Sequence, residues 1–212
     1  MTYTALIPVK TLATAKSRLA HYLSQHQRET LVLDMLHHVL YVLLDSRLLE
    51  RVSVVSPDTR VLAQAKAWGA HALIEEQQGH NAALHAAALR EQATGATAIL
   101  TISADLPLLC TSDIQALIDR SKQHQVVLGS SLDGSGTNAL LVRPPLALPF
   151  LFGPGSLHRY LDAARQKHLS SVVLRRIGLA FDVDTTGDLR ELQVLRSESR
   201  QIPHDEKSGA CC

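Results

Sequence analysis

The sequence predicts a single α/β domain of Rossmann-like form, in which helices flank a mainly parallel central sheet. The first observation behind this prediction is that strand-like aliphatic runs alternate with helical segments along the chain. The second is composition: 46% of the 212 residues are hydrophobic but only 4% are aromatic, so Leu, Val, Ile and Ala must build the core, as in buried parallel strands. The third is length, which suits one domain. We expect that domain to span residues 1–196 and a flexible polar tail to cover residues 197–212.

The expected strands are short aliphatic runs that stop at turn-forming residues. In chain order they are 4–9, closed by Pro8; 51–55, closed by Ser-Pro-Asp; 71–74; 96–103, closed by Asp-Leu-Pro; 126–130, followed by a Gly/Ser loop; 137–142, stopped by Pro144 and Pro145; 172–176; and 180–183.

The expected helices begin or end at residues that cap helices. In chain order they are 27–45, which is long and apolar; 59–68, ended by Gly69; 82–92, which is Ala-rich and can be capped by Asn81; one from residue 112 or 113; 157–167, opened by a Gly-Pro-Gly-Ser turn; and one from residue 185. No internal repeat or interdomain linker interrupts this order.

Charge and cysteine content exclude several kinds of protein. The formal net charge is +1, so no overall field draws the chain to nucleic acid or to an anionic membrane. The three cysteines, Cys110, Cys211 and Cys212, lack metal-ligand spacing. Without a signal peptide or an apolar run long enough to span a bilayer, we expect a cytoplasmic protein.

Three aspartates are candidate metal ligands because of where the expected strands end. Asp105 follows a buried strand, at the edge where ligands bind in parallel sheets. Asp182 and Asp184 are two apart and share one face if that segment is extended. Close carboxylates repel unless a cation or proton lies between them, and Mg²⁺ accepts few protein carboxylates beside phosphate and water. Turn or helix-capping aspartates remain the alternative.

Other polar segments offer groups that could hold an anion. Lys10, Lys16 and Arg18 follow the first strand and can meet a triphosphate, although a solvated basic helix start is the alternative and a Walker loop is excluded by the lack of glycine. Thr137 and Asn138 follow a glycine loop. Gly153 and Ser156 flank a helix start; for each of these two segments alone, ordinary turn chemistry is the slightly favoured interpretation. Asn81 either caps its helix or contacts a base or ribose.

No set of residues suits nucleophilic catalysis. The eleven histidines are scattered, and no Ser/His/Asp or Cys/His constellation is evident. Charge neutralisation and positioning are therefore the chemistry that these residues support.

The motifs occur in the order that is found in the guanylyltransferases of coenzyme F420 biosynthesis, a family that the chain resembles from about Thr4 to Leu192. The segments that carry the resemblance are Ile7-Pro8-Val9-Lys10, Ala15-Lys16-Ser17-Arg18-Leu19, Ser103-Ala104-Asp105-Leu106-Pro107, Gly136-Thr137-Asn138, Phe152-Gly153-Pro154-Gly155-Ser156 and Asp182-Val183-Asp184-Thr185. Members act on 2-phospho-L-lactate, phosphoenolpyruvate or 3-phospho-D-glycerate. His80 departs from the pattern, which has an apolar residue before Asn81.

The resemblance implies a glycosyltransferase-A-like nucleotidyltransferase fold, GTP as donor, Mg²⁺ as cofactor and a small phosphorylated carboxylic acid as acceptor. It implies metal binding by Asp105, Asp182 and Asp184, and acceptor binding by Thr137, Gly153 and Ser156. The expected nucleotide contacts are Lys10, Lys16, Arg18, Ser56, Asn81 and Ser103, and the expected catalytic groups are Lys10, Lys16, Arg18 and Asp105. A downstream transferase of the F420 pathway is a possible functional partner.

Three other functions remain open at this point. A molybdopterin or sugar-phosphate nucleotidyltransferase has the same fold, but it usually begins with a Gly-rich loop that this chain lacks. An Asp-x-Asp glycosyltransferase would match Asp182 and Asp184, but that motif normally lies mid-domain. A non-catalytic nucleotide-binding module would bind GTP without releasing pyrophosphate.

Overall fold

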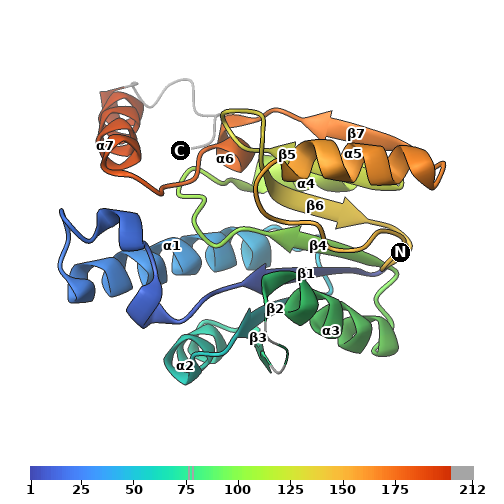
Figure 1. Cartoon of the computed structure of the whole chain (residues 1–212), viewed down its shortest axis with the longest axis horizontal. Coiled ribbons are helices and arrows are strands. Elements are labelled where there is room, and N and C mark those ends of the chain that lie inside the picture. Colours follow the sequence, from blue (N-terminus) through green and yellow to red (C-terminus); the bar gives the residue numbers. More distant parts are fainter. Residues whose placement is uncertain (76, 78, 202–212) are drawn as a thin grey trace.

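A seven-stranded sheet forms the centre of the computed structural model, which describes residues 1–75, 77 and 79–201. The strands lie in the order β3-β2-β1-β4-β6-β5-β7 (Figure 1). Their bounds are β1 Tyr3–Pro8, β2 Arg51–Ser56, β3 His71–Ile74, β4 Ala98–Ile102, β5 Val126–Ser130, β6 Thr137–Val142 and β7 Ser171–Leu174. Strand β6 runs antiparallel to β4 and β5, and the other described pairs are parallel. The predicted mainly parallel α/β architecture is confirmed.

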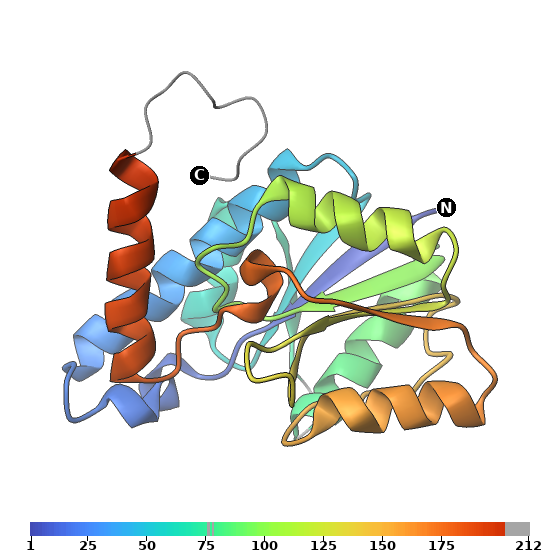
Figure 2. The ribbon, with the colours of Figure 1, turned by 90° about the horizontal axis from the view of Figure 1, so that it is seen from above.

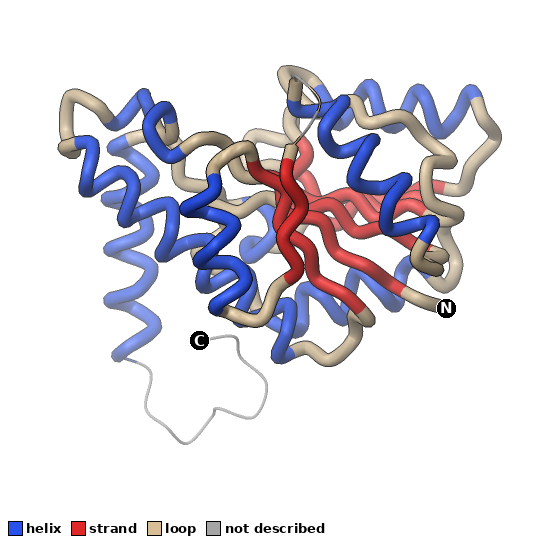
Figure 3. The backbone as a smooth tube through the Cα atoms, turned by 90° about the horizontal axis from the view of Figure 1, so that it is seen from below, coloured by secondary structure: helices blue, strands red, loops and turns tan. Residues whose placement is uncertain are grey.

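Helices cover both faces of the sheet (Figures 2 and 3). Helices α1 (Gln25–Asp45), α2 (Thr59–Ala67) and α4 (Thr111–Ser121) contribute to the largest core cluster on one face. Helices α3 (His80–Ala93) and α5 (Ser156–Gln166) pack on the other face. Among the described residues, none of the helices has the length and apolar character that a membrane span requires.

Alternating side chains explain why the strands are apolar along their whole length. In β1, Ala5 and Ile7 join the cluster under α1, whereas Leu6 joins the cluster under α3. In β4, Leu100 and Ile102 face α1 while Ile99 faces α3. Because successive residues point to opposite faces and both faces are covered, a parallel strand of this sheet has no solvent side.

The basic segment after β1 does not lead straight into a helix. It forms two short 3₁₀ turns, η1 (Leu12–Thr14) and η2 (Ser17–Leu19). Helix α1 then begins at Gln25, two residues before the predicted start, because Ser24 and Gln27 form a reciprocal capping box with bonds of 2.9 and 3.3 Å.

The predicted strand over residues 180–183 is wrong. Residues Ile177–Ala180 form the short helix α6, and an irregular segment follows. Phe181 and Val183 alternate as strand residues would, but they are buried against Met35 of α1 and Leu192 of α7. The alternation therefore reflects helix contacts, without sheet pairing.

The C-terminal helix α7, Thr186–Gln201, begins close to the predicted residue. It continues into the stretch that we expected to be a flexible tail, so residues 197–201 are helical. Residues 202–212, with Cys211 and Cys212, lie outside the described residues.

Gly178 allows α6 to approach α4 closely. A Cβ atom at Gly178 would lie 2.0 Å from Asp113 Oδ2 and 2.8 Å from the Leu108 carbonyl oxygen. Asp113 is buried, and its Oδ1 accepts a bond from Arg176 Nε at 2.5 Å. This contact fixes α6 and therefore the segment that follows it.

We expect Gly178→Ala to lower the free energy of unfolding by about 1–3 kcal/mol, because the added methyl must displace the buried carboxylate of Asp113. Thermal and urea unfolding would measure the loss. Gly187→Ala is the matched control: its Cβ meets no atom closer than 3.4 Å, and alanine favours a helix more than glycine does. Equal midpoints for Gly178→Ala and wild type would contradict the packing argument.

Candidate functional site

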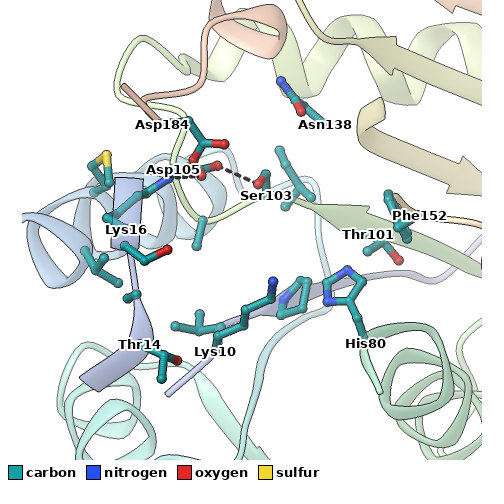
Figure 4. A pocket seen from close by; sticks show the side chains of 18 of the residues that line it. Lys10, Thr14, Lys16, His80, Thr101, Ser103, Asp105, Asn138, Phe152 and Asp184 are labelled. Atoms are coloured by element: carbon teal, nitrogen blue, oxygen red, sulfur yellow. Dashed lines mark hydrogen bonds and ion pairs between the residues drawn. The ribbon is translucent and has the colours of Figure 1, made fainter. Parts of the chain in front are cut away.

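A cavity of about 480 Å³ opens where the carboxyl ends of β1 and β4 meet the start of β6. Its walls come from the loop after β1, α1, the start of α3, the exit of β4, the start of β6, Phe152 and Asp184 (Figure 4). This is the edge at which parallel sheets bind ligands. Seven of the predicted site residues line it: Lys10, Lys16, Arg18, Ser103, Asp105, Thr137 and Asp184.

The three predicted carboxylates lie together. Asp105, Asp182 and Asp184 each offer an oxygen atom, and these atoms all lie within 4.8 Å of one another. The side chains are partly buried. Three carboxylate oxygens match the hard oxygen ligands that Mg²⁺ and Mn²⁺ prefer, so this donor set fits a divalent cation.

Neighbouring polar groups hold two of the three carboxylates in place. Ser103 Oγ donates to Asp105 Oδ1 at 2.6 Å. Asn138 Nδ2 donates to Asp182 Oδ1 at 3.1 Å and to the Ala180 carbonyl oxygen at 3.2 Å. These bonds orient the carboxylates without neutralising them.

The start of α7 fixes the backbone of Asp184. Asp188 Oδ2 accepts from the Asp184 amide at 2.8 Å and from the Thr185 amide at 2.6 Å, and Thr185 Oγ1 accepts from the Asp188 amide at 3.3 Å. This reciprocal pattern is that of a helix cap, and the Thr-x-x-Asp spacing in the sequence was the signal for it.

Lys16 provides the positive charge nearest to the carboxylates. Its backbone is left-handed (φ 49°), its side chain is 9% exposed, and its ammonium group contacts Asp105 and, at 2.8 Å, Asp184 Oδ1. Arg18 lies farther out, with its guanidinium 3.6 Å from Asp184 Oδ2. Lys16 therefore links the loop after β1 both to Asp105, at the exit of β4, and to Asp184, in the segment before α7.

The pKa directions agree with this arrangement. Burial alone would lower the pKa of Lys16, but Asp105 and Asp184 outweigh it and raise that pKa above its ordinary value. Burial would raise the pKa of Asp184, but Lys16, Arg18 and Lys10 hold it below its ordinary value. The pKa of Asp182 is raised by burial and then by its two acidic neighbours.

Ser56, a predicted nucleotide contact, lies away from the cavity. It is fully buried, and its Oγ accepts from the Asp58 amide at 3.1 Å. Asp58 in turn accepts from the Leu12 amide at 3.0 Å. Ser56 and Asp58 therefore support the loop that carries Lys10 and Lys16, and a nucleotide contact by Ser56 remains a prediction.

Asn81, another predicted nucleotide contact, bonds the backbone of a distant segment. Its side-chain amide pairs with the backbone of Phe152, donating to the carbonyl oxygen at 3.1 Å and accepting from the amide at 3.0 Å. Both polar atoms of the Asn81 side chain therefore bond the backbone of Phe152, and a nucleotide contact by Asn81 remains a prediction.

The predicted acceptor residues divide into two groups. Thr137 lines the cavity, whereas Gly153 and Ser156 lie behind Phe152, at the turn into α5, and do not line it. Ser156 is buried. Acceptor binding by these three residues remains a prediction.

Sequence reasoning missed Thr101 and Phe152 as cavity residues. Thr101 is buried on β4 within an apolar run, and the only sequence signal was its two-residue spacing from Ser103 on the same strand face. Phe152 was noted only as part of a motif. Both residues line the cavity only because segments that are far apart in the sequence meet there in the fold.

Comparison with known proteins adds independent evidence. Residues 3–202 match the family model described as guanylyl transferase CofC like. Proteins named phosphoenolpyruvate guanylyltransferase from Rubrobacter xylanophilus and Sphaerobacter thermophilus are 44% and 42% identical, each over 91% of this chain and over 94% and 93% of their own length. A protein named 2-phospho-L-lactate guanylyltransferase from Methanothermobacter thermautotrophicus is 35% identical, over 89% of this chain and 82% of its own.

Solved structures share the fold at low sequence identity. A protein from Desulfovibrio desulfuricans G20, provisionally titled a nucleotide-diphospho-sugar transferase, superposes with a TM-score of 0.79 at 17% identity and covers 94% of this chain and 90% of its own. A Mycobacterium tuberculosis protein solved in complex with manganese superposes with a TM-score of 0.60 at 18% identity, over 91% of this chain and 98% of its own. The predicted nucleotidyltransferase fold is confirmed, and the family match extends over nearly the whole chain. The protein is thus a nucleotidyltransferase that belongs to the guanylyl transferase CofC-like family.

Proposed function

We propose that this protein transfers GMP from GTP to the phosphate of phosphoenolpyruvate, with release of pyrophosphate, as a cytoplasmic step of coenzyme F420 biosynthesis. The observation that carries the proposal is the group of three carboxylates beside Lys16 at the cavity floor. Phosphoenolpyruvate is favoured as the acceptor because two relatives at 42% and 44% identity are named for it, while two relatives named for 2-phospho-L-lactate are 28% and 35% identical.

The proposed reaction balances without a general base. A phosphate oxygen of phosphoenolpyruvate attacks the α-phosphorus of GTP, and the bond from that phosphorus to the bridging oxygen breaks. Pyrophosphate leaves with the electron pair, and a diphosphate diester joins guanosine to enolpyruvate. The attacking phosphate is largely dianionic near pH 7, because its second pKa is about 6. This agrees with the described cavity residues, among which no side-chain nucleophile is bonded to a neighbouring general base.

The residues of the chain position and neutralise the reacting groups. Asp105, Asp182 and Asp184 would hold Mg²⁺, which supplies positive charge to the phosphates when bound. Lys16 and Arg18, which flank the carboxylates, offset negative charge on the triphosphate. Lys10, which also lines the cavity, adds a third cation, and Ser103 and Asn138 keep two of the carboxylates oriented. A downstream transferase of the pathway would consume the reactive diester.

The test of this function offers purified protein Mg²⁺ and GTP with phosphoenolpyruvate, 2-phospho-L-lactate or 3-phospho-D-glycerate, and follows pyrophosphate. We expect the highest kcat/KM with phosphoenolpyruvate. ATP and nucleotide sugars serve as donor controls. If a nucleotide sugar releases free nucleoside diphosphate while no acid releases pyrophosphate from GTP, the guanylyl transfer assignment is wrong.

Removing one carboxylate should abolish most of the activity. We expect Asp105→Asn and Asp182→Asn each to lower kcat by about 10²–10³-fold, because phosphate charge is no longer offset at the reacting centre. Both variants should also lose the thermal stabilisation that Mn²⁺ gives the wild type. Asp162→Asn on α5, an exposed aspartate paired with Arg165, is the matched control. Wild-type turnover in either cavity variant would refute the assignment of the carboxylates.

Lys16→Met should separate cation binding from catalysis. Deleting one positive charge beside Asp105 and Asp184 makes the group more negative, so we expect Mn²⁺ to bind about tenfold more tightly. Catalysis should fall about 100-fold, because the triphosphate loses a partly buried cation. Calorimetry with Mn²⁺ and steady-state kinetics would show both effects. Lys122→Met, which removes an exposed lysine paired with Asp119, should change neither, and weaker Mn²⁺ binding by Lys16→Met would contradict the electrostatic argument.

A further inference from the structure

Thr101 presents a buried hydroxyl group to the cavity. The residue is 2% exposed, it lines the cavity, and its Oγ1 has no hydrogen-bond partner among the described residues. Buried hydroxyl groups are normally bonded, and leaving one unpaired destabilises the fold. An aliphatic residue would fill this central strand position without that cost, so the free hydroxyl indicates a ligand contact.

The position of Thr101 on β4 explains how its hydroxyl reaches the cavity. Side chains two apart on a strand share one face, so Thr101 lies on the same face as Ile99, which packs under α3, and as Ser103, which bonds Asp105. Figure 4 shows Thr101 near Phe152 and His80, at the opposite end of the cavity from Lys16. The cavity thus has one end with carboxylates and cations and another end beside α3.

The end beside α3 is built from planar rings and neutral polar groups. The rings of His80 and Phe152 meet edge to face, with centroids 5.6 Å apart and an interplanar angle of 86°. Burial, and then the charge of Lys10, lower the pKa of His80 below its ordinary value, so the imidazole is neutral near pH 7. Asn81 fixes the backbone of Phe152 through two hydrogen bonds. This end therefore presents two uncharged rings and a hydrogen-bonded Phe152 backbone, and the charge of Lys10 lies close enough to act on His80.

The two reactants differ in their fit to such a surface. Every polar atom of phosphoenolpyruvate belongs to a phosphate or a carboxylate, and these groups favour cations. A guanine base is planar and neutral, and it carries ring nitrogens and a carbonyl that a hydroxyl and an imidazole can bond. Aromatic side chains also offer a surface to bases.

We propose that Thr101 hydrogen-bonds the guanine base of the nucleotide, and that Thr101, His80 and Phe152 together form the base subsite. The proposal rests on the function proposed above, since it assumes that the donor is GTP. It assigns His80 to the same subsite, because its ring meets that of Phe152 at the cavity.

Thr101→Val is the central test, because it removes the hydroxyl and keeps the shape. We expect the thermal midpoint of the unliganded variant to stay the same or rise, since no internal hydrogen bond is lost. The KM for GTP should rise about five- to tenfold, the loss typical of one neutral hydrogen bond. The KM for phosphoenolpyruvate should not change, and Thr101→Ser should restore the wild-type value for GTP.

Two further variants separate this role from a structural one. Ser53→Ala removes a buried strand hydroxyl that does have a partner, Glu91 Oε1 at 2.6 Å, so its midpoint should fall while both KM values stay unchanged. Thr137→Val removes the other unpaired buried hydroxyl of the cavity. Thr137 lies on β6 and is one of the residues expected to bind the acceptor. We therefore expect Thr137→Val to raise the KM for phosphoenolpyruvate and to leave the KM for GTP unchanged.

The outcomes distinguish this inference from the proposed function. A lower midpoint for Thr101→Val with unchanged KM values would show a structural hydroxyl, and a higher KM for phosphoenolpyruvate alone would place the acceptor at this end. Either result overturns the inference. GTP binding measured by calorimetry without any acceptor tests Thr101 separately: weaker binding by Thr101→Val supports the base subsite even if no acid accepts GMP, a result that would refute only the proposed function.

Discussion

The repulsion among three partly buried carboxylates is the constraint on which the surrounding structure depends. Oxygens of Asp105, Asp182 and Asp184 lie within 4.8 Å of one another, so their negative charge must be offset for the fold to keep them together. Lys16 provides the nearest offset, and its left-handed backbone lets the loop after β1 turn its ammonium group inward. Ser103, Asn138 and Asp188 then fix the direction of individual carboxylates or of their backbone. A cation that binds phosphates can be held here because the carboxylates are already oriented.

The reversed direction of β6 is what brings the two halves of the site together. Because β6 runs antiparallel to β4, its first residues lie beside the last residues of β4, and the Ser103 amide donates to the Asn138 carbonyl oxygen at 2.8 Å. Asn138 also bonds Asp182. One short stretch of β6 therefore connects the exit of β4 with the segment after α6. A parallel strand at this place would put its first residues at the opposite edge of the sheet, away from the carboxylates.

Much of the fold could be predicted from the sequence, because buried parallel strands are continuous aliphatic runs that end at recognisable turns. Asp105 could be predicted for the same reason, as it follows such a run. Asp182 and Asp184 were correctly paired, although the strand assigned to them was wrong: Phe181 and Val183 pack on α1 and α7, and alternation alone cannot show which surface buries a side chain. Ser56 and Asn81 could not be assigned from the sequence, because a hydroxyl or amide has the same local pattern whether it bonds a ligand or a distant backbone group.

The bond between Asn81 and Phe152 has a consequence for how the two reactants are bound. Asn81 lies at the start of α3, which packs over the half of the sheet that contains β1 to β3. Phe152 leads into α5, which packs over the half that contains β5 and β6, and the two residues are joined by two hydrogen bonds. A displacement of α5 would therefore move a wall of the cavity that α3 also shapes. Since the nucleotide and acceptor must meet with their reacting atoms about 3–3.5 Å apart, a shared wall helps to fix one reactant relative to the other. In the proposed function the catalytic contribution of this fold is then mainly geometric: charge at one end of the cavity would hold the phosphates, and the ring surface at the other end would limit where the rest of the nucleotide can lie.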